Sequence, residues 1–256
     1  MKSRIYSLLF AFVLILSTTA ADNAGRQYYE LRVYTTKSEK QQNQISDYWQ
    51  NAAVPAYNRM GVKPIGVFTE LEDSPTNKIY VVIPFDSLDA FAQVASKLAA
   101  DSTYQKDAEE FMSVPKNDPA YVRFDSSLLL AMEGMKKLTL PPASAEKKPW
   151  IFELRTYLSH NEAKGINKVE MFNAAEIPVM QQVGLSPVFF AQSIVGTQLP
   201  NLTYMVSGEN MEEHKKHWQG FGPNPVWKKI SGDPQYKDNV SKIINVFLKR
   251  TPASQI

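Results

Sequence analysis

The chain repeats itself over most of its length, and this repeat constrains the fold more than any other feature. "YYELRVYTT" at residues 28–36 and "IFELRTYLS" at 151–159 share Glu-Leu-Arg, one variable residue and Tyr. The two halves align without a gap from Tyr28 to Glu70 at an offset of 123 residues. So long a period indicates a duplicated domain rather than a solenoid. The identical pairs are Glu30/Glu153, Leu31/Leu154, Arg32/Arg155, Tyr34/Tyr157, Glu39/Glu162, Ala52/Ala175, Pro55/Pro178, Gly61/Gly184 and Pro64/Pro187.

Both halves predict the same order of elements. Alternating aromatic and β-branched residues predict a first strand at 28–36 and at 151–158. A helix follows, and Pro55 and Pro178 would kink or restart it, because proline lacks the N–H that a helix needs. Gly61 and Gly184 suit the left-handed residue after a helix end. In the first half the apolar stripe of this helix is Ile45, Tyr48, Trp49, Ala52 and Ala56.

Two strands, a second helical region and a final strand complete each half. The segments are 64–71, 78–85, 87–112 and 121–132 in the first half, and 187–194, 201–207, 210–236 and 241–250 in the second. The order β-α-β-β-α-β predicts a ferredoxin-like unit with one bare sheet face. Two bare faces would cover each other. We therefore predict an α+β fold of two tandem ferredoxin-like halves that form a pseudo-dimeric α+β barrel around a shared interior.

The predicted domains are 27–135 and 150–251, joined by the proline-containing, charged linker "KKLTLPPASAEKKP" within 136–149. Residues 1–21 are typical of a signal peptide: "MKSR" is basic, "IYSLLFAFVLIL" is a short apolar stretch, and "STTAAD" offers cleavage after Ala20 or Ala21. An uncleaved membrane anchor is the alternative. The prediction is export, to the periplasm or outside the cell.

Composition excludes several classes of function. The chain has no Cys, which removes disulfides, thiolate metal sites and Cys nucleophiles. Its net charge is +2 with mixed signs, which does not indicate a nucleic-acid or membrane surface for the mature chain. No nucleotide, phosphate-loop or zinc-protease motif occurs, so we predict no cofactor and no metal. A small-molecule ligand, a protein partner or a second copy of the chain remain as partners.

With the paired Glu-Leu-Arg-x-Tyr strands and the shared Pro, Gly and Pro of the first connection, the chain resembles the NIPSNAP family of the dimeric α+β barrel group. "D..Y" at Asp101 and Tyr104, and again at Asp233 and Tyr236, also resembles the family's second-helix region. The resemblance covers residues 28 to 250. It implies a fold more than a reaction, because the family has no settled activity and its mitochondrial members are linked to organelle quality control and protein partners. Barrel relatives include cofactor-independent monooxygenases, haem-degrading enzymes and dehydratase-like proteins, a likeness of fold alone.

Strand alternation divides the repeated motif between two faces. We assign Tyr29, Leu31, Val33, Phe152 and Leu154 to the face that packs against helices. The acid, base and phenol of each copy then point into the barrel. The candidate pocket residues are therefore Glu30, Arg32, Tyr34, Glu153, Arg155 and Tyr157.

Two interpretations of these six residues are open, because burying an unpaired charge costs several kcal/mol. In the scaffold interpretation each Glu pairs with an Arg through two hydrogen bonds, and the tyrosines cap the network. In the ligand interpretation Arg binds a carboxylate or enolate, Glu is a base and Tyr donates a hydrogen bond. Catalysis usually needs one specialised site, whereas both halves keep the same three residues, which favours the scaffold.

The remaining candidates are weaker. His214 and His217 are three residues apart and could hold a metal, but Lys215 and Lys216 between them favour a solvated helix. His160 has no histidine at the matching position of the first half, which favours a surface loop residue over a catalytic base. An extra aromatic segment of the second half could pack the outer helix layer, or form a lid or partner surface; its residues are Trp218, Phe221 and Trp227.

The function that these observations favour is an exported, non-catalytic module that binds a small molecule or a protein. The alternative is an enzyme like a cofactor-independent monooxygenase or isomerase, acting on a small organic acid or aromatic in the barrel interior.

Overall fold

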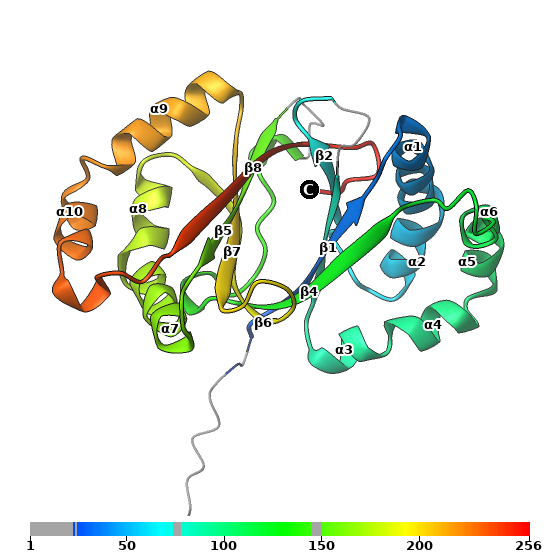
Figure 1. The fold of residues 1–256 in the computed structure, drawn as a ribbon, viewed down its shortest axis with the longest axis horizontal. Helices are drawn as coiled ribbons and strands as arrows, with labels where there is room; N and C mark the ends of the chain where they lie inside the picture. Colours follow the sequence, from blue (N-terminus) through cyan, green and yellow to red (C-terminus); the bar gives the residue numbers. More distant parts are fainter. Residues whose placement is uncertain (1–22, 24, 74–77, 145–149) are drawn as a thin grey trace, which may run out of the picture.

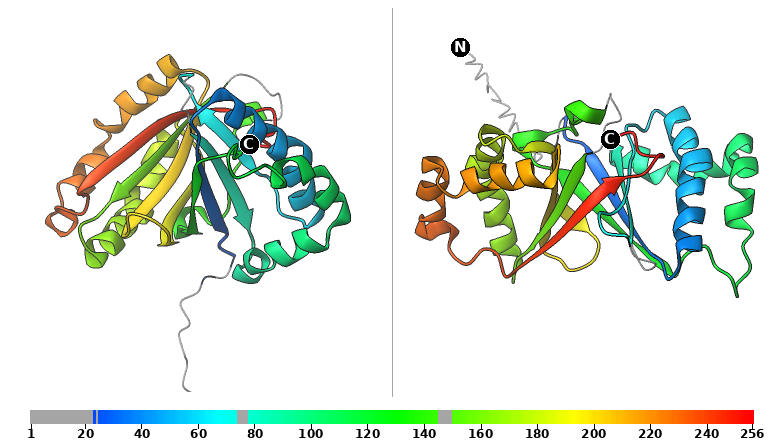
Figure 2. Two further views of the ribbon diagram at one scale, coloured as in Figure 1. Left: turned by 45° about the vertical axis from the view of Figure 1, so that its right-hand side comes forward. Right: turned by 90° about the horizontal axis from the view of Figure 1, so that it is seen from above.

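The structure is a computed structural model, and it describes residues 23, 25–73, 78–144 and 150–256. Eight antiparallel strands close into a barrel in the order β1-β3-β2-β8-β5-β7-β6-β4. One layer of helices covers each side of the barrel (Figure 1), and the view from above separates the two layers clearly (Figure 2). The predicted α+β barrel of two ferredoxin-like halves is confirmed.

The first half runs through β1 (Tyr28–Thr35), α1 (Glu39–Tyr48), η1 (Trp49–Ala53), α2 (Val54–Arg59), β2 (Gly66–Glu70), β3 (Ile79–Phe85), α3 (Leu88–Ala92), α4 (Val94–Ala100), α5 (Ser102–Asp107), α6 (Glu109–Met112) and β4 (Arg123–Ala131). Two short turns, η2 (Glu133–Met135) and η3 (Pro142–Ser144), follow it. The second half runs through β5 (Ile151–Leu158), α7 (Glu162–Met171), η4 (Phe172–Glu176), α8 (Ile177–Gln182), β6 (Ser186–Val195), β7 (Asn201–Gly208), α9 (Met211–Phe221), α10 (Pro225–Ser231), η5 (Pro234–Tyr236) and β8 (Lys242–Arg250).

The two halves join along two seams. β4, β1, β3 and β2 form one four-stranded sheet, and β8, β5, β7 and β6 form the other. Antiparallel pairing of β2 with β8 and of β4 with β6 closes the barrel. The predicted signal segment 1–21 and residues 145–149 of the predicted linker lie outside the described residues, and the exact domain boundaries stay a prediction. None of the helices in the described ranges combines the length and the hydropathy of a membrane-spanning segment.

The first helix of each half changes geometry before its proline. α1 and α7 each pass into one π-helical turn, η1 or η4, and the α-helical form resumes with Pro55 or Pro178 in the first turn of the next helix. Proline cannot donate to the carbonyl four residues earlier, so the regular ladder is already interrupted there. As predicted, Gly61 and Gly184 take positive φ, +79° and +89°, just after these helices.

The barrel interior is apolar. Tyr29 packs against Phe189 with ring centroids 5.1 Å apart, and Phe68 packs against Phe152 at 4.8 Å. Ile256 is fully buried in the same cluster. Leu31 and Leu154 also belong to this interior cluster, so our assignment of the two strand faces is wrong.

The correction has a physical reason. β1 and β5 are buried on both faces, so alternation alone cannot show which face meets the helices. A closed interior that is filled by side chains of the strands themselves favours apolar residues. The helix layers instead contribute polar partners to the outer face, such as the Tyr57 hydroxyl, the His214 imidazole and the Trp218 indole. The polar members of both motifs therefore lie between sheet and helices.

Candidate functional site

The first copy of the polar motif is a closed ion pair. Arg32 holds the carboxylate of Glu30 with two hydrogen bonds, Nε to Oε1 at 2.5 Å and Nη2 to Oε2 at 3.1 Å. Arg32 Nη2 also donates to the Tyr57 hydroxyl at 3.2 Å, and the Ser126 hydroxyl donates to Glu30 Oε1 at 2.7 Å. The predicted two-bond pairing is confirmed here. Tyr34 is buried in the apolar layer beside these residues.

The second copy has a different geometry. Arg155 donates from Nη1 to Glu153 Oε1 at 2.9 Å, and this is a single bond. The other carboxylate oxygen, Oε2, lies 2.7 Å from His214 Nε2 and 2.6 Å from Trp218 Nε1. A carboxylate only accepts, so both nitrogens donate to it. Arg155 Nε is buried and has no hydrogen-bond partner within the described part of the chain.

These contacts decide the charge of Glu153. Burial raises the pKa of its carboxyl, but the hydrogen bond from His214, the charge of Arg155 and the hydrogen bond from Trp218 outweigh burial and hold the pKa below its usual value. Glu153 is therefore an ionised carboxylate near neutral pH, buried among three donors.

We predicted that His214 lies on a solvated helix face. This prediction is wrong, because His214 is fully buried. A Cβ atom placed on Gly208 would lie 2.9 Å from His214 Nδ1, so the imidazole packs directly on glycine backbone. At the offset of the repeat, the first half has Phe85 and Phe91 at these positions, with ring centroids 5.5 Å apart. The glycine makes room for a histidine that reaches Glu153. No group of three or more potential ligands is arranged for a metal among the described residues.

A second ion pair lies in the same helix layer. Lys168 Nζ donates to Glu176 Oε1, and their side chains are 5% and 2% exposed. The ammonium lies 5.2 to 5.8 Å from the ring centroids of three aromatic side chains, a favourable cation–π arrangement; these are Tyr157, Phe172 and Trp227. Burial raises the pKa of Glu176, although the Lys168 charge opposes this.

Sequence reasoning missed Lys168 and Glu176, although the repeat contains a signal for them. At the same offset, the first half has Ile45 and Ala53, both fully buried and apolar. Charged residues at positions that are apolar in the other copy mark the second half as different. The six predicted pocket residues form two separate clusters, one in each half. In the second cluster the Tyr157 hydroxyl lies 3.1 Å from the Tyr204 hydroxyl.

A cavity of about 170 Å³ opens at one end of the barrel, away from the packed aromatic pairs. Its walls are apolar at Leu31, Val33, Leu154 and Val246. Polar groups surround them: Thr156 and Thr203 hydroxyls lie 2.8 Å apart, and Ser193 donates to Asn201 at 2.6 Å. The Asn201 amide donates to the carbonyls of Thr197 and Gln198, which fixes the β6–β7 loop at the cavity. None of the six predicted residues lines this cavity.

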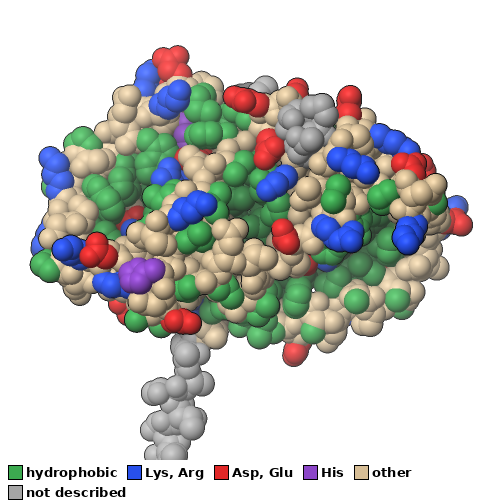
Figure 3. Space-filling model, in the orientation of Figure 1, with side chains coloured by type: hydrophobic (Ala, Val, Ile, Leu, Met, Phe, Trp, Pro, Cys, Tyr) green, Lys and Arg blue, Asp and Glu red, His purple; other side chains and the backbone are tan. Residues whose placement is uncertain are grey.

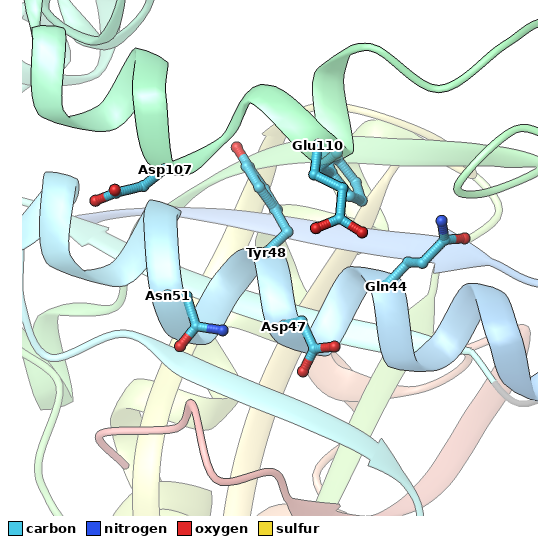
Figure 4. A pocket seen from close by; sticks show the side chains of 7 residues that line it. Gln44, Asp47, Tyr48, Asn51, Asp107 and Glu110 are labelled. Carbon is cyan, nitrogen blue, oxygen red and sulfur yellow. The ribbon is translucent and has the colours of Figure 1, made fainter.

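A smaller pocket of about 110 Å³ lies between the helices of the first half. Figure 4 shows Asp47 and Asn51 on the first helical segment, and Asp107 and Glu110 on the neighbouring helices α5 and α6. Tyr48 closes the pocket, with its hydroxyl 2.8 Å from that of Tyr104. The three carboxylates are on exposed residues. Gln44 also lines the pocket, and its buried Oε1 has no hydrogen-bond partner within the described chain.

Known proteins share this fold. Two candidate monooxygenases match with TM-scores of 0.55 and 0.57: one from Fusobacterium nucleatum (9% identity, 88% of this chain and 92% of that chain) and one from Lactobacillus acidophilus (11% identity, 90% and 97%). An anthrone oxidase-like protein matches with a TM-score of 0.51 at 8% identity, over 90% of this chain and 93% of that chain. These identities show a common fold and no more. No curated protein matches the sequence. The family model named NIPSNAP matches residues 29–124 and 152–255, and the chain therefore belongs to the NIPSNAP family.

Proposed function

We propose that this protein binds a small molecule in the cavity at the open end of its barrel, without transforming it. The observation that carries this proposal is the cavity itself, about 170 Å³ inside an otherwise packed interior. An engineered apolar protein cavity of about 150 Å³ holds one benzene molecule. A single ring or a short branched chain would therefore fit.

The cavity walls indicate what such a ligand looks like. Leu31, Leu154 and Val246 offer an apolar surface. The Thr156 and Thr203 hydroxyls share one hydrogen bond, and each hydroxyl can still form others. Lys78 and Asp125 place one charge of each sign at the cavity. A ligand with an apolar body and one hydrogen-bonding end matches this wall.

Catalysis in the same cavity is the alternative. The specific feature that favours it is Asp125, a carboxylate at the cavity wall that could accept a proton from a bound substrate. The likeness to candidate monooxygenases supports only the shared barrel. If mass spectrometry detects a new product formed from a bound compound, the protein is an enzyme and the non-catalytic proposal is wrong.

The proposal is tested by filling the cavity. Val246→Phe adds a ring to the cavity wall, whereas Asn245→Gln changes the neighbouring residue on the outer face of β8. Ligand-observed NMR with a library of single-ring alcohols and amides is expected to find ligands for the parent protein. Val246→Phe should lower the affinity for these ligands at least tenfold, and Asn245→Gln should leave the affinity unchanged.

Two outcomes contradict the proposal: no ligand for the folded parent protein, or equal binding to Val246→Phe. Thermal melting of both variants shows that each is folded. In the second outcome the ligand binds elsewhere on the molecule.

We also propose that the protein acts after export, on the evidence of residues 1–21 alone. Expression of the full chain in a bacterium, followed by N-terminal sequencing of the periplasmic and membrane fractions, tests this. The expected product is soluble and begins at Ala21 or Asp22. An intact chain confined to the membrane fraction would instead support an anchor.

A further inference from the structure

We propose that the guanidinium of Arg155 is a second binding site, specific for a carboxylate and separate from the barrel cavity. The two halves provide the comparison. Arg32 uses Nε and Nη2 together to hold Glu30, so this fork is closed. Arg155 uses only Nη1 for Glu153, so the edge formed by Nε and Nη2 does not hold this carboxylate, and the buried Nε has no hydrogen-bond partner within the described residues.

Two residues of α9 keep this fork open. His214 and Trp218 both donate to Glu153 Oε2, the carboxylate oxygen that accepts no hydrogen bond from Arg155. Neither contact has a counterpart in the first half, where Phe91 stands at the position of His214. The arrangement holds Glu153 in place and leaves a planar pair of donors for another group.

The open edge needs a partner. A buried N–H without a hydrogen bond is rare in folded proteins and points to a missing water, ion or ligand. A carboxylate matches the spacing of two parallel guanidinium N–H groups better than water does. Two rings lie against the guanidinium: the centroids of Trp218 and Tyr157 are 4.8 Å and 5.4 Å from the Arg155 Cζ atom.

The site reaches solvent beside β8, although α9 packs on the same strand through His214 and Phe247. The Arg155 side chain is 18% exposed, and Asn245 lies opposite Arg155 across the strand pair. Ile243 is 46% exposed on the same outer face. β8 crosses the front of the molecule in Figure 1, and Figure 3 shows apolar side chains exposed on this face. Nε itself is buried, so the side chains around it must move before a carboxylate can bind there.

These surroundings define the ligand class. The carboxylate would bind the guanidinium, and an apolar or aromatic body would lie along Trp218 and the exposed Ile243. A simple aromatic carboxylate is therefore the appropriate probe. Such a site does not depend on the barrel cavity, because Arg155 and Leu154 lie on opposite faces of β5.

The test is a benzoate titration followed by the NMR signals of arginine Nε–H and tryptophan Nε1–H groups. We expect saturable shifts of the Arg155 and Trp218 signals in the parent protein. Arg155→Lys keeps the charge but removes the fork, and should weaken binding at least tenfold. Arg32→Lys is the matched control: it changes the closed fork and should leave the affinity for benzoate within twofold.

Val246→Phe separates this site from the proposed barrel site. Benzoate binding that survives Arg155→Lys but is lost in Val246→Phe would place the ligand in the barrel and overturn the proposal. Unshifted Arg155 and Trp218 signals in the parent protein at saturating benzoate would overturn it as well. The second result needs no variant, so it holds even if Arg155→Lys fails to fold.

Discussion

Lys168→Ala is expected to lower the free energy of unfolding by about 3–5 kcal/mol, because it leaves the Glu176 carboxylate buried without its partner. The Glu176 side chain is 2% exposed, and Lys168 is its hydrogen-bond partner. Urea unfolding at pH 7 measures the loss as a fall in midpoint at unchanged slope.

The first half of the protein supplies the control. The double variant Lys168→Ile with Glu176→Ala recreates the apolar pair Ile45 and Ala53. Replacement of a buried ion pair by apolar residues is often neutral, or stabilising by about 1–4 kcal/mol. We therefore expect the double variant to be at least as stable as the parent. Losses that simply add in the double variant would show that the two residues are not coupled.

The single variant should also depend on pH in a defined direction. Burial already raises the pKa of Glu176, and loss of the Lys168 charge raises it further. The folded state then binds a proton more tightly than the unfolded state does. The free energy of unfolding of Lys168→Ala therefore rises as the pH falls from 7 through the raised pKa of Glu176, and the deficit against the parent narrows. A deficit that stays constant down to pH 5 would contradict this mechanism.

The repeat made the fold predictable from sequence. Its two copies agree on every strand, on the glycine that ends the first helix and on the proline within that helix, so local and global signals are consistent. The orientation of β1 was not predictable. Glu30 and the partly buried Arg32 lie on one face and the buried Tyr29 on the other, and nothing in an isolated strand shows which face meets the helices.

The second-half cluster was hidden for a different reason. Lys168 and Glu176 are eight residues apart, beyond the three- and four-residue spacings at which helix neighbours are usually recognised. The π-helical turn η4 lies between them and ends at Glu176. Likewise, the lysines beside His214 indicated solvent, whereas its burial depends on Gly208, a strand residue that only the fold brings next to it.

Comparison of the two halves also explains why the same motif can serve two roles. In the first half the Glu30–Arg32 pair satisfies itself and receives further bonds from Tyr57 and Ser126. In the second half the carboxylate is shared among Arg155, His214 and Trp218. The scaffold interpretation thus describes the first copy well, and a binding role is proposed for the second copy alone.

Glu153→Gln is the second large effect that we expect, a loss of about 3 kcal/mol at pH 7, because it leaves the buried charge of Arg155 without its counter-ion. Glutamine has the same shape, but its single carbonyl oxygen cannot accept from Arg155, His214 and Trp218 at their present positions. Urea unfolding measures the loss. Glu209→Gln, the same change on an exposed residue of the second half, should stay within about 0.5 kcal/mol of the parent.

Urea unfolding of the parent and of Glu153→Gln at decreasing pH tests the cause of that loss. Because the folded pKa of Glu153 is lowered, its ionised form contributes stability at every pH above the usual glutamate pKa. This contribution disappears as the pH falls through the lowered folded value, whereas glutamine has no proton to gain. The difference in unfolding free energy between parent and Glu153→Gln should therefore shrink steadily below about pH 4.5. A difference that grows on acidification would mean that the carboxylate is not stabilised by its three donors, and would remove the basis for an open fork at Arg155.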